Sequence, residues 1–171
     1  MAKIYLICGK ICCGKSTYTR KLRKEIGGAV VLSCDELVQN ILGGDLGDKH
    51  DEITDKVRAY LLRKAFEIVR PNDSSDSNDS SDTCGTNVIL EWGFWQQGYR
   101  EKIQQEIEEA GIDYEWHYID VTDERWAKNI KKRNASGAKD EYFVDDGLKE
   151  KCEMLFEEPS REFIQKWVVL D

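Results

Sequence analysis

Gly9-Lys10-Ile11-Cys12-Cys13-Gly14-Lys15-Ser16 decides the fold, because it matches in full the phosphate-binding loop pattern G-x-x-x-x-G-K-[ST]. An apolar run at residues 4–8 precedes it, and a helical pattern from 16 to about 26 follows it. A strand, a glycine-rich loop and a helix in this order present backbone N–H groups at a helix N-terminus, where phosphate binds. The stretch therefore predicts a site for a nucleoside triphosphate.

The residue types in this loop each have a physical reason. Gly9 and Gly14 let the backbone turn its N–H groups inward toward phosphate oxygens. Lys15 supplies a mobile cation for the outer phosphates, and the Ser16 hydroxyl is a candidate ligand for Mg²⁺. A glycine turn with an incidental lysine is the alternative, which the flanking strand and helix disfavour. The residues of this stretch expected to bind the nucleotide are Gly9, Lys10, Ile11, Cys12, Cys13, Gly14, Lys15, Ser16 and Thr17.

Length and composition indicate a single domain over residues 1–171 with a sizeable core. The net charge of −8 disfavours non-specific binding of nucleic acid, whose phosphates need a positive surface. No apolar stretch approaches the ~18 residues that a membrane span needs. The N-terminal apolar segment is short and runs directly into the loop, unlike a signal peptide. We therefore expect a cytoplasmic protein with no membrane partner.

The six cysteines are expected to be reduced thiols rather than disulfides or zinc ligands. The sequence has no C-x-x-C pair, and a metal held by Cys12 and Cys13 would pull the loop out of its phosphate-binding shape. The alternative is that the dipole at the start of the following helix lowers the pKa of a thiol and makes the loop sensitive to oxidation.

Apolar runs and helical patterns alternate along the chain, which predicts an α/β fold with a mainly parallel sheet. Asp48 is expected to cap a helix over about 49–70, and Gly111 to end a later helix. Because ligands bind at the carboxyl ends of parallel strands, the loop, Asp35 and Glu91 are expected to meet at one edge of the sheet. The expected strands are residues 3–8, 29–33, 87–91, 114–120 and 166–170.

Residues 72–83 read N-D-S-S-D-S-N-D-S-S-D-T, a near-perfect duplication without apolar side chains. Such a segment buries too little surface to offset the entropy cost of ordering it, so we expect a disordered Asp/Ser-rich loop at 72–86. Its aspartates lack the glycine and the terminal glutamate of an EF-hand, which disfavours Ca²⁺ binding.

Two carboxylates are candidates for chemistry. Asp35 follows the second expected strand within L-S-C-D-E-L, where it would orient or deprotonate an acceptor hydroxyl. Capping the next helix is the alternative role for this aspartate. Glu91 closes the apolar run V-I-L, where it would hold Mg²⁺ directly or through water, with a structural salt bridge as its alternative.

Aromatic residues follow Glu91 directly. They are expected either to wall a pocket for a ring-bearing acceptor or to plug the edge of the sheet. The candidates for contact with the acceptor are Trp92, Phe94, Trp95 and Arg100.

The segment 125–133 concentrates positive charge in an acidic protein, and small polar residues follow it. This composition predicts a lid at about 134–145 that closes over the triphosphate. We expect Arg133 to be a catalytic cation on the lid and Arg125 to bind the nucleotide. A solvated helix face is the alternative meaning of such a charge run.

Five stretches taken together resemble one family: G-K-I-C-C-G-K-S at 9–16, S-C-D-E-L at 33–37, V-I-L-E-W-G-F-W at 88–95, K-K-R-N at 131–134 and F-E-E-P at 156–159. It is the small P-loop kinase family that includes phage polynucleotide kinase, chloramphenicol phosphotransferase and zeta toxins. The resemblance covers nearly the whole chain apart from the 72–83 repeat.

The resemblance implies a P-loop NTPase fold with three α/β/α layers and a five-stranded parallel sheet in the order 2-3-1-4-5. It also implies ATP and Mg²⁺ as cofactors, with Lys15, Asp35 and Arg133 as the catalytic residues. Two departures stand out. Val38 occupies the position where polynucleotide kinase has an arginine for the phosphate of its acceptor, and Glu91 stands where many relatives have aspartate.

These features predict an ATP-dependent kinase that phosphorylates a hydroxyl of a small molecule such as an antibiotic, nucleoside, sugar or nucleotide-sugar. Val38 and the net charge make nucleic acid an unlikely acceptor. The alternatives are an ATP-hydrolysing switch module and a 5′-hydroxyl polynucleotide kinase. The sequence leaves open the acceptor and the oligomeric state.

Overall fold

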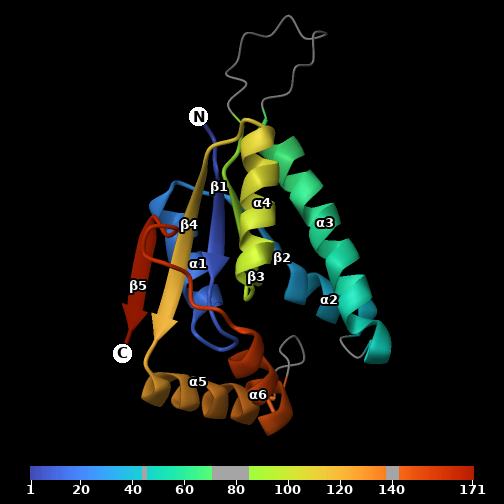
Figure 1. The fold of residues 1–171 in the computed structure, drawn as a ribbon, viewed down its shortest axis with the longest axis vertical. Coiled ribbons are helices and arrows are strands. Elements are labelled where there is room, and N and C mark those ends of the chain that lie inside the picture. Colours follow the sequence, from blue (N-terminus) through green and yellow to red (C-terminus); the bar gives the residue numbers. More distant parts are fainter. Residues whose placement is uncertain (44–45, 71–84, 138–142) are drawn as a thin grey trace, which may run out of the picture.

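Five parallel strands form one sheet in the order β2-β3-β1-β4-β5, with helices on both faces (Figure 1). The computed structural model describes residues 1–43, 46–70, 85–137 and 143–171. The predicted α/β/α fold and its strand order are confirmed. The predicted loop at 72–86 lies almost entirely outside the described residues, as does the middle of the predicted lid.

The strands are β1 (Ile4–Cys8), β2 (Val30–Ser33), β3 (Val88–Gly93), β4 (Tyr114–Val121) and β5 (Lys166–Leu170). The helices are α1 (Lys15–Glu25), α2 (Cys34–Leu42), the short 3₁₀ helix η1 (Gly47–Lys49), α3 (His50–Val69), α4 (Gln97–Glu109), α5 (Asp123–Ser136) and α6 (Asp146–Leu155).

β1 is the central strand, hydrogen-bonded to β3 on one side and to β4 on the other. Its side chains alternate between the two faces of the sheet. Ile4 and Leu6 pack with α3 and α4, whereas Tyr5 and Ile7 pack with α1. Because helices cover both faces, the strand reads as a continuous apolar run rather than an alternating one.

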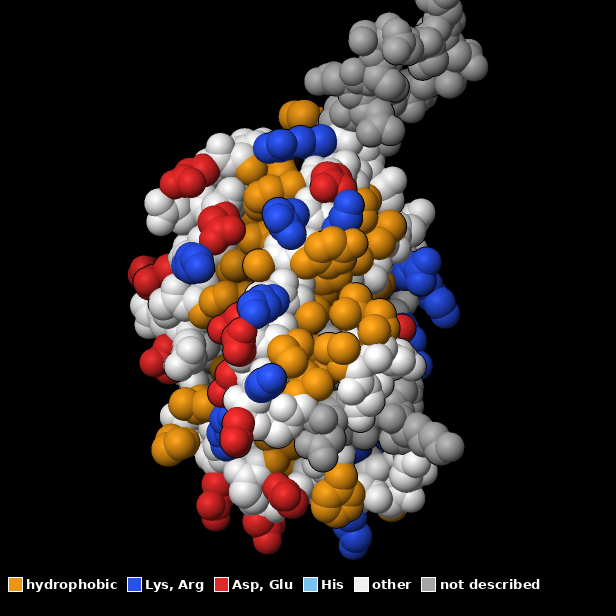
Figure 2. Space-filling view, turned by 90° about the vertical axis from the view of Figure 1, so that its right-hand side faces the viewer, with side chains coloured by type: hydrophobic (Ala, Val, Ile, Leu, Met, Phe, Trp, Pro, Cys, Tyr) orange, Lys and Arg blue, Asp and Glu red, His pale blue; other side chains and the backbone are white. Residues whose placement is uncertain are grey.

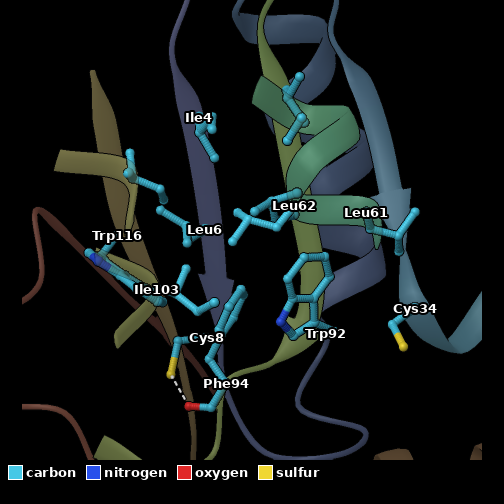
Figure 3. Close-up of a cluster of buried hydrophobic side chains, with 14 of the residues drawn as sticks. Ile4, Leu6, Cys8, Cys34, Leu61, Leu62, Trp92, Phe94, Ile103 and Trp116 are labelled. Carbon is cyan, nitrogen blue, oxygen red and sulfur yellow. Dashed lines mark hydrogen bonds between the residues drawn. The ribbon is translucent and has the colours of Figure 1, made fainter. Parts of the chain in front are cut away.

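The larger core lies between the sheet and helices α3 and α4. Figure 3 shows Leu6 of β1, Leu62 of α3 and Ile103 of α4 in this cluster, with Trp92 and Phe94 at its lower end. Full burial of an apolar side chain contributes about 1.5–3 kcal/mol to folding. The cluster therefore fixes the carboxyl end of β3 firmly against β1.

A smaller core lies under the phosphate-binding loop. It joins Cys12 of the loop to Trp126 of α5, to Val144, which precedes α6, and to Cys152 of α6. α5 and α6 lie beyond the carboxyl ends of the strands (Figure 1), so this cluster attaches the C-terminal helices to the loop.

Two local expectations differ from the structure. Asp48 does not cap α3: it lies in η1, and the residue before the helix, Lys49, makes no side-chain cap. β3 continues through Gly93, so Glu91 lies inside the strand, paired with Ile7 of β1 and Ser33 of β2. Pairing with β1 extends β3 past Glu91, where its apolar run ends, whereas Asp48 is exposed and lies in η1.

The predicted lid at 134–145 begins as helix, because α5 continues through Ser136 and ends before Gly137 in a left-handed conformation. The Asn134 side chain then joins the two ends of the segment. Its Nδ2 donates to the Val144 carbonyl at 2.7 Å, and its Oδ1 accepts from the Val144 N–H at 2.9 Å. The segment is thus anchored at both of its described ends.

Figure 2 shows the side of the molecule that lies at the right in Figure 1, where hydrophobic side chains alternate with charged ones. A hollow of about 420 Å³ lies between α3 and α4, lined by Lys56, Ala59, Leu62, Arg63, Phe66 and Glu106. Among the helices of the described residues, none combines the length and apolar composition of a membrane span.

His117 of β4 is buried in a polar chain of side chains. Its Nδ1 lies 2.9 Å from the Tyr18 hydroxyl, and its Nε2 lies 3.2 Å from a Glu115 carboxylate oxygen. Burial lowers the pKa of His117 below its ordinary value, more than the Glu115 carboxylate raises it. The imidazole is therefore neutral in the folded protein at neutral pH.

This lowered pKa predicts a pH-dependent stability. Unfolded His117 takes up a proton near pH 6.5, while the folded form resists it, so the free energy of unfolding falls as the pH drops below that value. The slope contributed by one histidine is at most about 1.4 kcal/mol per pH unit. Urea unfolding of wild type and His117→Asn between pH 5 and 8 measures it. Equal slopes in the two proteins would contradict the assignment.

Candidate active site

A cavity of about 1010 Å³ opens at the carboxyl ends of the strands, next to the phosphate-binding loop. This volume is at the upper end of the range for small-molecule sites. The residues that line it come from the loop, α1, α2, α3, the end of β3, α5 and α6. They include Ile11, Cys12, Gly14, Lys15, Ser16, Thr17, Asp35, Asp51, Thr54, Asp55, Arg58, Glu91, Trp92, Phe94, Trp95, Arg125, Asn129, Lys132, Arg133 and Lys151.

The loop has the backbone shape that its glycines predict. Gly14 caps α1 with φ +106°, and Gly9 has φ +156°. A Cβ on Gly9 would lie 2.6 Å from Cys13 Sγ and 2.9 Å from the Ile119 carbonyl oxygen, so a larger residue cannot fit there. Among the predicted nucleotide residues, Gly9, Lys10 and Cys13 shape the loop without lining the cavity.

Helix α5 holds the loop from behind. Trp126 Nε1 donates to the Ile11 carbonyl at 2.6 Å, and Asn129 Nδ2 donates to the Cys12 carbonyl at 2.9 Å. These bonds fix two backbone carbonyls of the loop in place. Sequence reasoning missed both residues, although their spacing of three places them on one face of a helix.

Lys15 lies within the loop, where its Nζ donates to the carbonyl oxygens of Gly9 at 3.1 Å and Lys10 at 2.6 Å. Burial works to lower its pKa, but Cys13 and the carboxylates of Asp35 and Glu91 outweigh burial, so the pKa is raised. Lys15 therefore stays protonated as a cation beside the cavity.

Ser16 and Glu91, the two predicted metal ligands, are in contact. Ser16 Oγ donates to Glu91 Oε1 at 2.5 Å. A hydroxyl and a carboxylate oxygen are hard ligands of the kind Mg²⁺ prefers, and Mg²⁺ in phosphate sites takes few protein ligands because phosphates and water supply the others. The pair fits this ion, and no salt-bridge partner is recorded for Glu91 within the described residues.

Asp35 occupies the first turn of α2 and lines the same cavity as Lys15. It is not the cap of this helix, because Ser33 precedes the helix and its Oγ accepts from the Glu36 N–H at 3.3 Å. The capping alternative for Asp35 is therefore wrong. Its carboxylate is one of the charges that raise the pKa of Lys15.

The aromatic residues after Glu91 line the cavity and belong to the core at the same time. Trp92 and Phe94 are only 3% and 1% exposed, and their ring centroids lie 5.0 Å apart. Trp95 is half-buried. Both sequence-based interpretations therefore describe part of the arrangement, since the rings close the sheet edge and form one wall of the cavity.

Arg100 does not face the cavity, which corrects its assignment as a contact of the acceptor. It is 1% exposed, and its Nη1 donates to the carbonyls of Phe94 at 2.8 Å and Trp95 at 3.0 Å. The turn after β3 explains this use of an arginine. Gly93 and Phe94 both have positive φ, so the chain turns away from the sheet there, and Arg100 supplies a donor to the Phe94 and Trp95 carbonyls that follow.

We expect Arg100→Met to destabilise the fold by about 1.5–3 kcal/mol, because it removes two charged hydrogen bonds to buried backbone carbonyls. Arg70→Met is the matched control, since Arg70 donates to the Ala110 carbonyl at an exposed position. Urea unfolding of the two variants measures the difference. Similar midpoints would contradict the structural role of Arg100.

The F-E-E-P stretch also supports this turn. The Glu157 N–H donates to the Trp95 carbonyl at 2.9 Å, and the Glu157 carboxylate accepts from the Gln97 N–H. Phe156 and Trp126 lie near Lys10 Nζ, at 5.8 and 4.8 Å from their ring centroids. The stretch thus ties the β3 turn to the region of the loop.

The two predicted arginines line the cavity on α5. Arg125 is exposed, and its Nη1 donates to the Asp171 carbonyl at 2.9 Å. Arg133 lies near the end of the helix, at the start of the predicted lid. Lys132 of α5 and Arg20 of α1, which the sequence analysis did not select, add further positive charge to the lining of the cavity.

The cysteines near the loop are buried, without disulfides among Cys8, Cys12, Cys13, Cys34 and Cys152. Burial raises the pKa of Cys13, and it raises the pKa of Cys8 and of Cys34 to about 12. Burial therefore favours the neutral thiol at these three positions, which argues against the oxidation-sensitive alternative there.

A protein-family model described as "AAA domain" matches residues 4–159, which is most of the chain. The chain belongs to this family of P-loop kinases. The match of the AAA domain begins at β1 and includes the loop, Asp35, Glu91, α5 and the F-E-E-P stretch. No curated protein matches the sequence significantly.

Solved structures share the fold of this AAA-family chain at low sequence identity. A putative kinase from Chloroflexus aurantiacus has a TM-score of 0.70 at 16% identity, over 99% of this chain and 88% of that chain. APS kinase CysC of Mycobacterium tuberculosis, in complex with AMPPNP and APS, has a TM-score of 0.60 at 19% identity, over 99% and 89%. A chain of the Pnkp1/Rnl/Hen1 RNA repair complex has 0.65 at 17%, over 90% and 43%.

Proposed function

We propose that this protein is an ATP-dependent kinase that transfers the γ-phosphoryl group to a hydroxyl of a small molecule. One observation carries the proposal: a protonated Lys15, the Ser16–Glu91 pair and the Asp35 carboxylate all line or border a single cavity. Phosphoryl transfer needs this set, because the protein mainly positions the reactants and stabilises charge.

The residues divide the work by position. The loop N–H groups and Lys15 bind the outer phosphates of ATP, and Arg125 and Arg133 face them from α5. Ser16 and Glu91 would hold Mg²⁺, which neutralises charge on the phosphates. Asp35 accepts the proton of the acceptor hydroxyl while the hydroxyl oxygen forms a bond to the γ-phosphorus of ATP. The bond between the γ-phosphorus and the oxygen that bridges it to the β-phosphate breaks, which releases ADP.

Two rival functions use the same loop. A switch module would hydrolyse ATP without any acceptor, and a polynucleotide kinase would use the 5′-hydroxyl of a nucleic acid. Val38 is 1% exposed and packs in the core, so its position offers no cation for an acceptor phosphate. The net charge of −8 also supports a small acceptor rather than a nucleic acid.

Measuring ADP release from ATP and Mg²⁺ with a panel of hydroxyl compounds and a short 5′-hydroxyl oligonucleotide tests the proposal. We expect release to rise with one class of small molecule and the product to carry phosphate from γ-labelled ATP. Release that no acceptor changes supports the switch module. Label transferred to the oligonucleotide supports the polynucleotide kinase.

A further inference from the structure

Three buried polar atoms without a hydrogen-bond partner belong to side chains of residues that line the cavity. The described part of the chain has five such buried side-chain atoms, and Thr54 Oγ1, Arg58 Nε and Trp92 Nε1 are three of them. All three residues line the cavity next to the loop. Because buried polar groups are normally paired, this grouping marks a place for a ligand.

The three atoms lie on the α3 and β3 side, away from the α5 arginines. Thr54 and Arg58 are one helical turn apart on α3, so they share a face. This face packs against the start of α2, because Cys34 Sγ donates to the Thr54 carbonyl at 3.9 Å. Asp35 follows Cys34 directly and lines the same cavity, so Thr54 and Arg58 lie on a helix that contacts the helix of the proposed base.

The Arg58 guanidinium is positioned but not neutralised. It lies over the Tyr99 ring, with 5.6 Å from its carbon to the centroid. Its one recorded ion pair is Nη1 to Asp55 Oδ1 at 3.5 Å, and the Asp55 side chain is 73% exposed. Such exposed pairs are weak and exchange readily with a better partner.

The other acidic side chains on this wall do not cancel the charge. Asp51 is 82% exposed and pairs with Lys151 of α6 at 3.8 Å. Glu91 accepts a hydrogen bond from Ser16 Oγ, and the charges of Asp35 and Glu91 both raise the pKa of Lys15. Arg58 is therefore the cation on the α3 side that is open to a ligand within the described residues.

The chemistry of the three atoms restricts the ligand. Arg58 Nε and Trp92 Nε1 can only donate, and the Thr54 hydroxyl can donate as well. Two or three donors around one cation match an oxyanion, which accepts charge-assisted hydrogen bonds from arginine. A neutral polyol would satisfy Thr54 and Trp92 but would leave the guanidinium without an opposite charge.

We propose that the acceptor is a hydroxyl compound that also carries a carboxylate or a phosphate monoester, and that Arg58, Trp92 and Thr54 bind this oxyanion while the hydroxyl lies at Asp35. This inference rests on the proposed kinase function. It names an acceptor-binding residue, Arg58, that no sequence motif indicated.

Three probes with the same three-carbon backbone test whether an anion is needed and whether it is a carboxylate or a phosphate: glycerol, glycerate and glycerol 3-phosphate. The protein is first saturated with Mg²⁺ and AMPPNP, which fills the phosphate loop and prevents transfer. NMR of the arginine Nε–H groups then follows Arg58, whose signal is assigned from its loss in Arg58→Lys. We expect the signal to shift with glycerate or glycerol 3-phosphate and not with glycerol, and the responding probe identifies the oxyanion.

Two substitutions separate the anion site from the fold. Arg58→Gln is expected to weaken binding of the responding probe about 10- to 100-fold, which corresponds to losing a hydrogen bond to a charged group. Arg63→Gln is the matched control on the same helix, exposed and outside the cavity, and is expected to bind the probe normally. Arg58→Lys keeps the charge and should recover part of the affinity. Thermal unfolding confirms that each variant is folded.

The outcomes distinguish this inference from the function on which it rests. No shift of Arg58 with either anion, or an equal shift with glycerol, overturns the oxyanion site. So does unchanged binding by a folded Arg58→Gln. Failure of every hydroxyl compound to increase ADP release overturns the kinase function, and that result does not depend on the NMR titration.

Discussion

Asp35→Asn is expected to lower the rate of phosphoryl transfer by about 10²–10⁴-fold while leaving ATP affinity unchanged. The amide has nearly the size of the carboxylate, so the cavity keeps its shape, but it cannot take the proton of the acceptor hydroxyl. Nucleotide binding should persist because the loop and α5 supply its contacts. Steady-state ADP release with the identified acceptor measures the rate, and calorimetry with AMPPNP measures the affinity.

Glu36→Gln is the control for this substitution, because Glu36 neighbours Asp35 in the first turn of α2 but is exposed and does not line the cavity. It removes the same charge from the same helix. Transfer at the wild-type rate by Asp35→Asn would remove the proposed role of the carboxylate. An equal loss in both variants would indicate a general electrostatic effect instead.

Lys15→Met is expected to remove detectable transfer and to weaken nucleotide binding. Methionine keeps most of the length of the side chain but lacks the cation that faces the outer phosphates. Removal of one group that stabilises charge in a transition state typically costs about 10²–10³-fold in rate, and Lys15 also contributes to binding of the ground state. Binding of AMPPNP and single-turnover transfer measure the two effects separately.

The control for Lys15 is Lys21→Met, on the exposed side of the same helix, where the lysine pairs with Glu25 at 3.7 Å. Because Lys15 also donates to two loop carbonyls, the unfolding midpoint of Lys15→Met shows how much of the effect is structural. A stable variant with normal affinity and rate would contradict the role of Lys15.

The elements that are local in sequence were predictable. The loop and α1 form a strand–loop–helix unit whose glycines, lysine and serine have fixed spacing, so its shape follows from the residues within it. The five strands are short, mainly apolar runs, and each lies within two residues of its expected bounds. The prediction that Asp48 caps α3 was wrong because several polar residues near a helix start give similar cap signals.

The site was predictable only where the sheet edge brings residues together. Asp35 and Glu91 follow from the rule that ligands bind at the carboxyl ends of parallel strands. Arg100 was misplaced because an arginine beside aromatic residues gives no sign of whether it faces the ligand or the backbone. The strained turn at Gly93 and Phe94 decided that, and its positive φ values arise only in the folded chain.

The sequence by itself determined the α/β fold and the phosphate-binding loop, because these depend on periodicity and on spacing within a short segment. Only the tertiary structure decided which face of α3 lines the cavity. Thr54 and Arg58 could therefore be identified as candidate ligand-binding residues only from the structure. The physical reason is that a polar residue on a helix is solvated or ligand-facing according to what packs beside it. For α3 that neighbour is the start of α2, which is distant in sequence.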